Sequence, residues 1–218
     1  MNFGELKAEV FRRLEESSSS PVYFTTSEVG DALNEGYEEI SDASEWTEAS
    51  ITINLLPGQI YYWIGHPSVL ALTPKQAFNN QNSRWLTWRT VGDLDRMSSQ
   101  WEISQGEPDQ MFTRGLGWIG FWPITPSTGG TITLYFTSLP SALSSDSDTP
   151  GFPQEFHLGL VEYALYDLFA QEAEVEKALR FWARYKGKEA ELNQYVQRRA
   201  KDRRTAFTGG KESYPNRF

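Results

Sequence analysis

Few residues of this chain combine the types and the spacing that catalysis requires. The 218 residues include no cysteine and only two histidines, which excludes a disulfide framework, thiolate metal ligands and a cysteine nucleophile. The sequence has neither a G-x-S-x-G nucleophile motif nor an H-E-x-x-H zinc motif. His66 precedes Pro67 in a predicted turn, and His157 follows Phe156 in the first turn of a predicted helix. We expect His157 to have a structural role.

Carboxylate pairs are the remaining candidates for catalysis. A glycosidase uses two Asp or Glu residues that have no fixed spacing in sequence. Glu45 with Glu48, and Asp93 with Asp95, are candidates by position alone. The sequence offers no further support for them, so we predict that the chain is not an enzyme and has no catalytic residue.

Two short patterns only partly match known ligand sites. Asp146 and Asp148 are too few for a calcium-binding loop. Residues 208–211 read Thr-Gly-Gly-Lys but lack the spacing and the preceding strand of a phosphate-binding loop. We therefore predict no metal site and no cofactor.

Tryptophan is abundant, with eight residues in the chain. Stacked aromatic rings bind sugars, so a carbohydrate-binding or wall-degrading protein is an alternative. Tryptophan is also favoured in hydrophobic cores and protein interfaces, and we prefer a small β core and a protein interface. The six tryptophans in or near the predicted β region are Trp63, Trp85, Trp88, Trp101, Trp118 and Trp122.

The charges divide the chain into two parts. Residues 1–176 carry 8 Lys/Arg and 25 Asp/Glu, a formal charge of −17. Residues 177–218 carry 12 Lys/Arg and 4 Asp/Glu, a formal charge of +8, so the net charge of the chain is −9. Such asymmetry is typical of an end that contacts another molecule. The basic end could instead lie on the acidic body of its own chain or of a neighbouring copy.

The basic end contains a run of cations followed by aromatic residues. Salt-sensitive DNA binding, an interface with another protein and a solvated helix end are three interpretations, of which the interface is preferred because aromatic and Arg side chains are common interface anchors. The predicted interface residues are Arg198, Arg199, Lys201, Arg203, Arg204, Phe207, Tyr214 and Phe218.

Two amphipathic helices are predicted at the start of the chain. Apolar residues spaced three and four apart predict helices at residues 2–16 and 25–40. Asn2 with Glu5, and Thr25 with Glu28, have the spacing of capping boxes. Off the apolar stripe of the second helix, a largely acidic face is either solvated or in contact with a basic partner: Glu35, Glu38, Glu39 and Asp42.

From Glu45 the hydrophobic period changes from helical to alternating, which indicates strands. A short helix, capped by Thr90 with Asp93, is expected at residues 90–98. The strands are expected at residues 50–55, 60–64, 69–73, 77–78 with 85–88 as a hairpin, 111–113 with 118–122 as a second hairpin, and 131–137.

The C-terminal part is predicted to be helical again. A helix that is apolar on nearly all sides begins near Pro153 and ends near Gln171, and it must be covered by other helices. The next begins near Glu174, with Val175 and Leu179 on its apolar side, and we expect a division near Gly187.

These elements predict an α+β fold, in which a four-helix bundle is interrupted by an inserted antiparallel β domain. The expected regions are an N-terminal helix pair (1–44), a β domain (45–137), a connector (138–151), a C-terminal helix pair (152–204) and an extended arm (205–218). No run of 18 apolar residues occurs, so we expect no membrane partner.

Three passages carry a resemblance to a known family. They are TTSEVGDALNEGYEEIS (25–41), IGFWPITPSTGGTITLYFTSLPSAL (119–143) and FPQEFHLGLVEYALYDLFAQE (152–172). With their order in the chain, they resemble the head-to-tail adaptor, or connector, proteins of tailed phages, especially short-tailed phages.

The resemblance implies a structural virion protein in the neck between head and tail, assembled in the host cytoplasm. It implies a ring of twelve copies between the portal protein and a tail or nozzle protein. The ring would continue the DNA channel, through which DNA passes during ejection without sequence-specific binding. The bundle and the C-terminal arm would contact the portal, and the β domain would face the tail.

Overall fold

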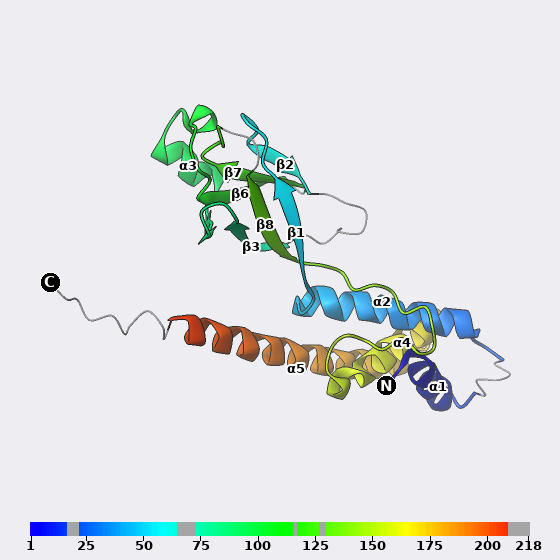
Figure 1. Cartoon of the computed structure of the whole chain (residues 1–218). Helices are drawn as coiled ribbons and strands as arrows, with labels where there is room; N and C mark the ends of the chain where they lie inside the picture. Colours follow the sequence, from blue (N-terminus) through cyan, green and yellow to red (C-terminus); the bar gives the residue numbers. More distant parts are fainter. Residues whose placement is uncertain (17–21, 65–72, 116, 127–129, 209–218) are drawn as a thin grey trace. The chain divides into compact units, whose positions relative to one another are not determined.

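The computed structural model describes residues 1–16, 22–64, 73–115, 117–126 and 130–208, and within them all side chains except those of Thr73 and residues 200–208. The chain forms two compact units, one of Met1–Trp46 with Pro140–Phe218 and the other of Thr47–Leu139. The first unit is helical and the second contains two sheets (Figure 1). The predicted α+β fold, with a β insertion in a helical bundle, is confirmed.

The helical unit is built around one apolar helix. The apolar α4 packs on each of the other three α-helices, as its sequence requires, and α1 and α2 supply the predicted cover. The elements are α1 (Phe3–Arg13), α2 (Thr26–Ser44), the 3-10 turn η2 (Gln154–Phe156), α4 (Leu158–Gln171) and α5 (Val175–Thr208).

The predicted capping boxes fix where the first two helices begin. The Asn2 side chain accepts a hydrogen bond from the Glu5 backbone N–H, and the Glu5 carboxylate accepts one from Asn2 N–H. Thr25 and Glu28 form the same reciprocal pair at α2. Each pair satisfies two donors that the first helical turn leaves without an intrahelical partner. Pro153 precedes the 3-10 turn η2 rather than α4 itself, which begins five residues later.

Gly36 allows α2 and α4 to approach closely. A Cβ atom on Gly36 would lie 2.8–2.9 Å from three carbon atoms of the Tyr163 side chain, which is closer than van der Waals contact permits. Tyr163 is buried, so the ring has little space into which it could move. The crossing of these two helices therefore depends on a residue without a side chain.

The second unit consists of two four-stranded sheets and a short helical cover. Sheet A has the strand order β1-β8-β3-β4, and sheet B has the order β2-β7-β6-β5. The elements are β1 (Glu48–Asn54), β2 (Tyr61–Trp63), β3 (Thr73–Asn79), β4 (Arg84–Trp85), β5 (Thr87–Trp88), α3 (Val91–Met97), the 3-10 turn η1 (Trp101–Ile103), β6 (Gln110–Arg114), β7 (Trp118–Trp122) and β8 (Thr131–Thr137).

The two sheets pack face to face, and α3 with η1 covers the far side of sheet B. Met111 and Phe112 are neighbours on β6, yet Met111 belongs to the core shared with sheet A, whereas Phe112 packs with Leu94 of α3 and Trp101 of η1. Successive side chains of a strand point to opposite faces, so sheet B is buried on both sides. The helical elements described in the second unit, α3 and η1, pack on sheet B rather than on the outer face of sheet A.

Several predicted strand boundaries are wrong. Residues 69–72 lie outside the described part, and β3 runs from Thr73 through the residues that we assigned to a separate hairpin. The hairpin pairs only Phe78 with Trp85 and Asn79 with Arg84. Leu86 is buried in the core between the sheets, and the chain then enters sheet B. There β5 pairs with β6 in parallel, so the β domain is not wholly antiparallel.

Candidate functional site

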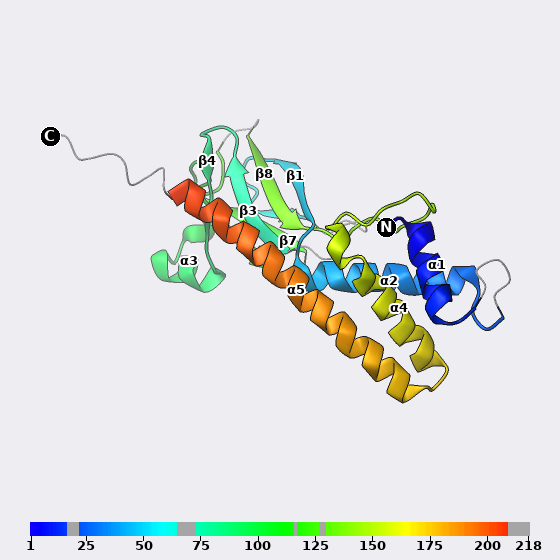
Figure 2. The same ribbon diagram turned by 90° about the horizontal axis from the view of Figure 1, so that it is seen from below.

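The long helix α5 extends beyond the bundle that holds its first part (Figures 1 and 2). Ala178, Tyr185 and Leu192 are buried at intervals of seven residues, the spacing of a seam that faces a neighbouring helix. Tyr195 and Val196 are partly buried against the bundle. The next three residues are exposed, so the bundle ends there while the helix continues to Thr208.

Three expectations for α5 are wrong. Gly187 neither ends nor divides the helix, since it lies on an exposed side where a Cβ atom would meet nothing within 4 Å. Residues 205–208, assigned to an extended arm, belong to the helix. Val175 and Leu179 also do not join the buried seam, because their side chains are 62% and 57% exposed.

The structure describes only part of the predicted basic interface. Arg198 and Arg199 are exposed on α5. Arg199 Nη1 donates a hydrogen bond to the Tyr195 hydroxyl at 3.1 Å, and its guanidinium carbon lies 5.4 Å from the ring centroid. The backbone places three cations and Phe207 on the same helical extension, but their side chains are outside the described part: Lys201, Arg203 and Arg204. Tyr214 and Phe218 also lie outside it.

The outward face of α2 carries a row of carboxylates. Asp31, Glu35, Glu38 and Asp42 are exposed and spaced by four, three and four residues, so they lie along one side of the helix. We call these four residues the acidic stripe. In the described part of the chain none of them forms an ion pair, whereas Glu39, on the adjoining side, lies 3.8 Å from Lys186 Nζ. The spacing of Asp31 could have added it to the predicted acidic face.

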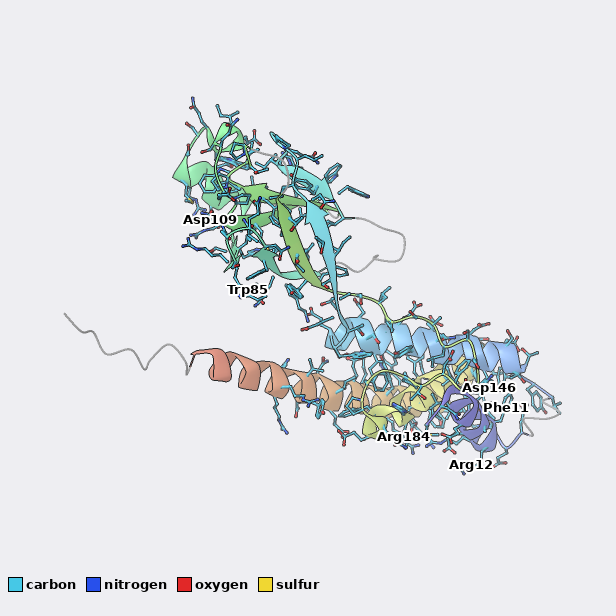
Figure 3. The ribbon with its side chains drawn as sticks, in the orientation of Figure 1. Phe11, Arg12, Trp85, Asp109, Asp146 and Arg184 are labelled. Carbon is cyan, nitrogen blue, oxygen red and sulfur yellow. The ribbon has the colours of Figure 1, made fainter. Side chains whose placement is uncertain are left out.

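One aromatic group of the second unit lies on the outer face of sheet A. Trp85, labelled in Figure 3, contacts Phe78 at 5.1 Å and Tyr135 at 5.6 Å between ring centroids. The rings are tilted by 66° and 47°, so they do not form a flat platform for sugar stacking. We call these three residues the aromatic trio. The periodicity alone did not single out Phe78 or Tyr135.

The six tryptophans divide between core and surface. Trp101 is buried and Trp122 is partly buried, and both pack around Phe112 beneath α3. Four tryptophans are exposed and lie outside the core, and for these the expected place in a protein interface stays a prediction: Trp63, Trp85, Trp88 and Trp118.

The carboxylates considered for catalysis have local structural roles. Asp93 caps α3, and hydrogen bonds from the Thr90 side chain and backbone lower the pKa of Asp93, whereas a glycosidase general acid needs a raised pKa. Asp95 accepts a hydrogen bond from Trp101 Nε1 at 2.7 Å. Glu45 is the left-handed C-cap of α2, and Glu48 begins β1.

The remaining candidate polar residues stabilise turns and helix packing. Asp148 accepts hydrogen bonds from the backbone N–H groups of Ser144 and Ser145, and these bonds lower the pKa of Asp148. Asp146 forms an ion pair with Lys7. Among the described residues, no group of three or more His, Asp or Glu side chains could hold a metal ion.

His157 is buried between the start of α1 and the turn before α4. Its Nε2 lies 2.9 Å from the carbonyl oxygen of Phe152, and its Nδ1 lies 3.1 Å from the backbone nitrogen of Met1. The expected structural role is therefore confirmed. Burial lowers the pKa of His157. His66 lies outside the described residues.

The notable surfaces of the chain are the cationic helical extension, the acidic stripe and the aromatic trio. No helix in the described part of the chain is long and apolar enough to cross a membrane.

Comparison with known proteins agrees with these features. The family model described as SU10 adaptor protein matches residues 1–210. No curated protein matches the chain. Because the family match covers nearly the whole chain, the protein belongs to the SU10 adaptor protein family, whose members are head-to-tail adaptors of phages, structural components of the virion and not enzymes.

Proposed function

We propose that this adaptor forms a ring of twelve copies in the neck of the virion, between the portal protein and a tail or nozzle protein. The ring continues the DNA channel, and DNA passes through it during ejection without sequence-specific binding. The observation that carries the proposal is the basic extension of α5, which leaves the bundle with Arg198 and Arg199 exposed. A ring requires two different surfaces of each copy to meet, and a protruding charged helix provides one of them.

The two units offer surfaces of different chemistry to different partners. The helical unit, with the basic extension and the residues that follow it, binds the portal or a neighbouring subunit. The β unit meets the tail component through the aromatic trio on sheet A. Exposed aromatic side chains are enriched in protein interfaces relative to the rest of a surface. The charges set which surfaces pair and how fast they meet more than how tightly they hold.

A reconstitution experiment tests the proposal. The full chain is mixed with purified portal, and the complexes are imaged by electron microscopy and weighed by native mass spectrometry. We expect a twelve-copy adaptor ring on one end of the portal. A chain without residues 205–218 should keep its helical circular dichroism spectrum and its thermal midpoint but lose portal attachment.

A variant with Arg198→Glu and Arg199→Glu tests the exposed cations directly. We expect weaker attachment that is further reduced by added salt, because exposed charge pairs are screened. The matched control is Lys177→Glu, at an exposed cation on the opposite end of α5. Full attachment of both the truncated chain and the double variant would contradict the role given to this end of the protein.

A further inference from the structure

The two charged surfaces of the helical unit are matched in length. Asp31 and Asp42, the ends of the acidic stripe, are 11 positions apart, which is about 17 Å at 1.5 Å per residue. Gln197 and Thr208, the ends of the α5 extension, are also 11 positions apart, so the extension is about 17 Å long by the same rise. Each surface lies along one α-helix.

The two surfaces also carry opposite charges, and each contains few or no charges of the other sign. The helix α2 contains no Lys or Arg. The extension has one acidic residue, Asp202, among five cations: Arg198, Arg199, Lys201, Arg203 and Arg204. In the described part of the chain, neither Arg198 nor Arg199 forms an ion pair with a carboxylate, and the four carboxylates of the acidic stripe have no cationic partner.

The surfaces cannot pair within one chain. The two helices meet where Lys186 lies 3.8 Å from Glu39. Arg198 lies twelve residues farther along the same continuous helix, about 18 Å beyond that contact. The helix α2 ends at Ser44, only five residues after Glu39. A continuous helix cannot turn back, so its basic end does not reach the acidic stripe of its own α2.

We propose that the acidic stripe of one copy binds the basic α5 extension of the next copy. This contact is heterologous, since each copy offers the stripe on one side and the extension on the other, and repetition of such contacts around an axis closes a ring. The inference rests on the ring of the proposed function and names one of its interfaces. A second copy is favoured over DNA as the occupant because DNA would repel the carboxylates and leave the acidic stripe unmatched.

Cysteine cross-linking tests the contact, because the chain has no cysteine of its own. One batch of full-length protein carries Asp42→Cys and a second carries Gln197→Cys, at two exposed positions. The batches are mixed, oxidised with and without portal, and resolved without reductant. We expect a disulfide-linked pair that contains one chain of each kind. The control pairs Asp42→Cys with Ala183→Cys, an exposed position on the part of α5 within the bundle.

Charge reversal distinguishes a specific contact from random collision. Glu35→Lys with Glu38→Lys, or Arg198→Glu with Arg199→Glu, should each lower the cross-linking yield about tenfold, since the altered surface loses its net charge and the attraction with it. A chain that carries all four reversals again has opposite charges at these four positions and should regain part of the yield. Circular dichroism of each variant checks that the fold is kept.

Two outcomes would overturn the inference. One is an equal cross-linking yield for the Ala183→Cys control. The other is a yield that the single-surface reversals do not change, or that the fourfold reversal does not restore. If the rings still form on the portal in either case, the ring function stands and this interface is wrong. If no ring forms under any condition with the unmodified chain, the proposed function itself fails.

Discussion

Arg13 of α1 and Glu162 of α4 join parts of the bundle that are 149 residues apart in sequence, with Arg13 Nη1 2.6 Å from Glu162 Oε1. The two side chains are only 20% and 11% exposed. Glu9 accepts a second hydrogen bond from Arg13 at 2.8 Å. Glu162 Oε2 has no hydrogen-bond donor and lies 3.9 Å from Arg184 Nη1. This network holds the first helix against the centre of the bundle.

Removal of one partner should destabilise the bundle strongly. We expect Glu162→Ala to lower the free energy of unfolding by about 2 kcal/mol, because the largely buried guanidinium of Arg13 loses one of its two carboxylate partners. Urea titration followed by circular dichroism measures the change. The control is Glu174→Ala, which breaks the exposed pair with Lys177 and should cost less than about 1 kcal/mol. Similar losses in the two variants would show that the Arg13 contact has no special role.

Alanine substitutions at Gly36 and Gly187 give a second matched comparison of stability. Gly36→Ala should lower the free energy of unfolding by about 2 kcal/mol, since its methyl group would overlap the Tyr163 ring. Gly187→Ala should raise it by about 0.5–1 kcal/mol, because the position is helical and open and alanine favours helices. Thermal and urea unfolding measure whether each substitution lowers or raises the free energy of unfolding. A stabilising effect of Gly36→Ala would mean that α2 and α4 can separate without loss.

The local signals in the sequence predicted the helices well. The capping boxes at Asn2, Thr25 and Thr90 all form, and the helices begin where they predict. The strand Thr131–Thr137 also has its predicted bounds. Each of these features depends on residues within a few positions of one another, so no knowledge of the rest of the fold was needed.

The features that depend on distant partners were not predictable in this way. The strands β4 and β5 are separated by one residue, Leu86, yet belong to different sheets. That choice depends on the core that forms between the sheets. The continuity of α5 past Gly187 depends on packing before and after that residue, which outweighs a local propensity of about 1 kcal/mol. Most of the acidic stripe could be predicted from the charged residues of the sequence. That the basic end of α5 does not reach the stripe in the same chain could be seen only from the way the two helices cross.

His157 should make stability depend on pH near neutrality. Burial lowers the pKa of His157 below its ordinary value of 6.5, so the unfolded chain binds this proton more readily than the folded chain. Stability is therefore lost as the pH falls below about 6.5, at less than about 1.4 kcal/mol per pH unit. Urea unfolding at about pH 7.5 and pH 5.5 measures the loss, and His157→Gln should reduce the difference between them.

The carboxylate of Glu9 gives a contrasting titration. Hydrogen bonds from Arg12, followed by those from Arg13, lower the pKa of Glu9 from 4.5 to about 2. The stability that the Glu9 carboxylate contributes is fully present above pH 4.5 and is lost as the pH falls through 2. This pH range does not overlap the range between about pH 7.5 and pH 5.5 in which His157 is tested. Glu9→Gln should therefore leave the change between about pH 7.5 and pH 5.5 intact. If it removed that change and His157→Gln did not, the assignment to His157 would be wrong.

Substitutions at Trp85, which is exposed, and Trp101, which is buried, distinguish a surface role from a core role in the β unit. Trp101 is buried, donates its Nε1–H to Asp95 and contacts Phe112 edge-on at 5.2 Å, so Trp101→Ala should cost about 3–5 kcal/mol of unfolding free energy. Trp85→Ser removes an exposed ring and its contacts with Phe78 and Tyr135, which should cost about 1 kcal/mol.

The same Trp85 variant should nevertheless impair assembly if the aromatic trio meets the tail. We expect Trp85→Ser to form rings on the portal normally and to bind the tail component at least tenfold more weakly, since buried tryptophans dominate many interfaces. Electron microscopy scores the rings, and surface plasmon resonance measures tail binding. Trp118→Ser, at another exposed tryptophan outside the trio, is the control. Equal losses for the two variants would mean that the trio is not the specific tail surface.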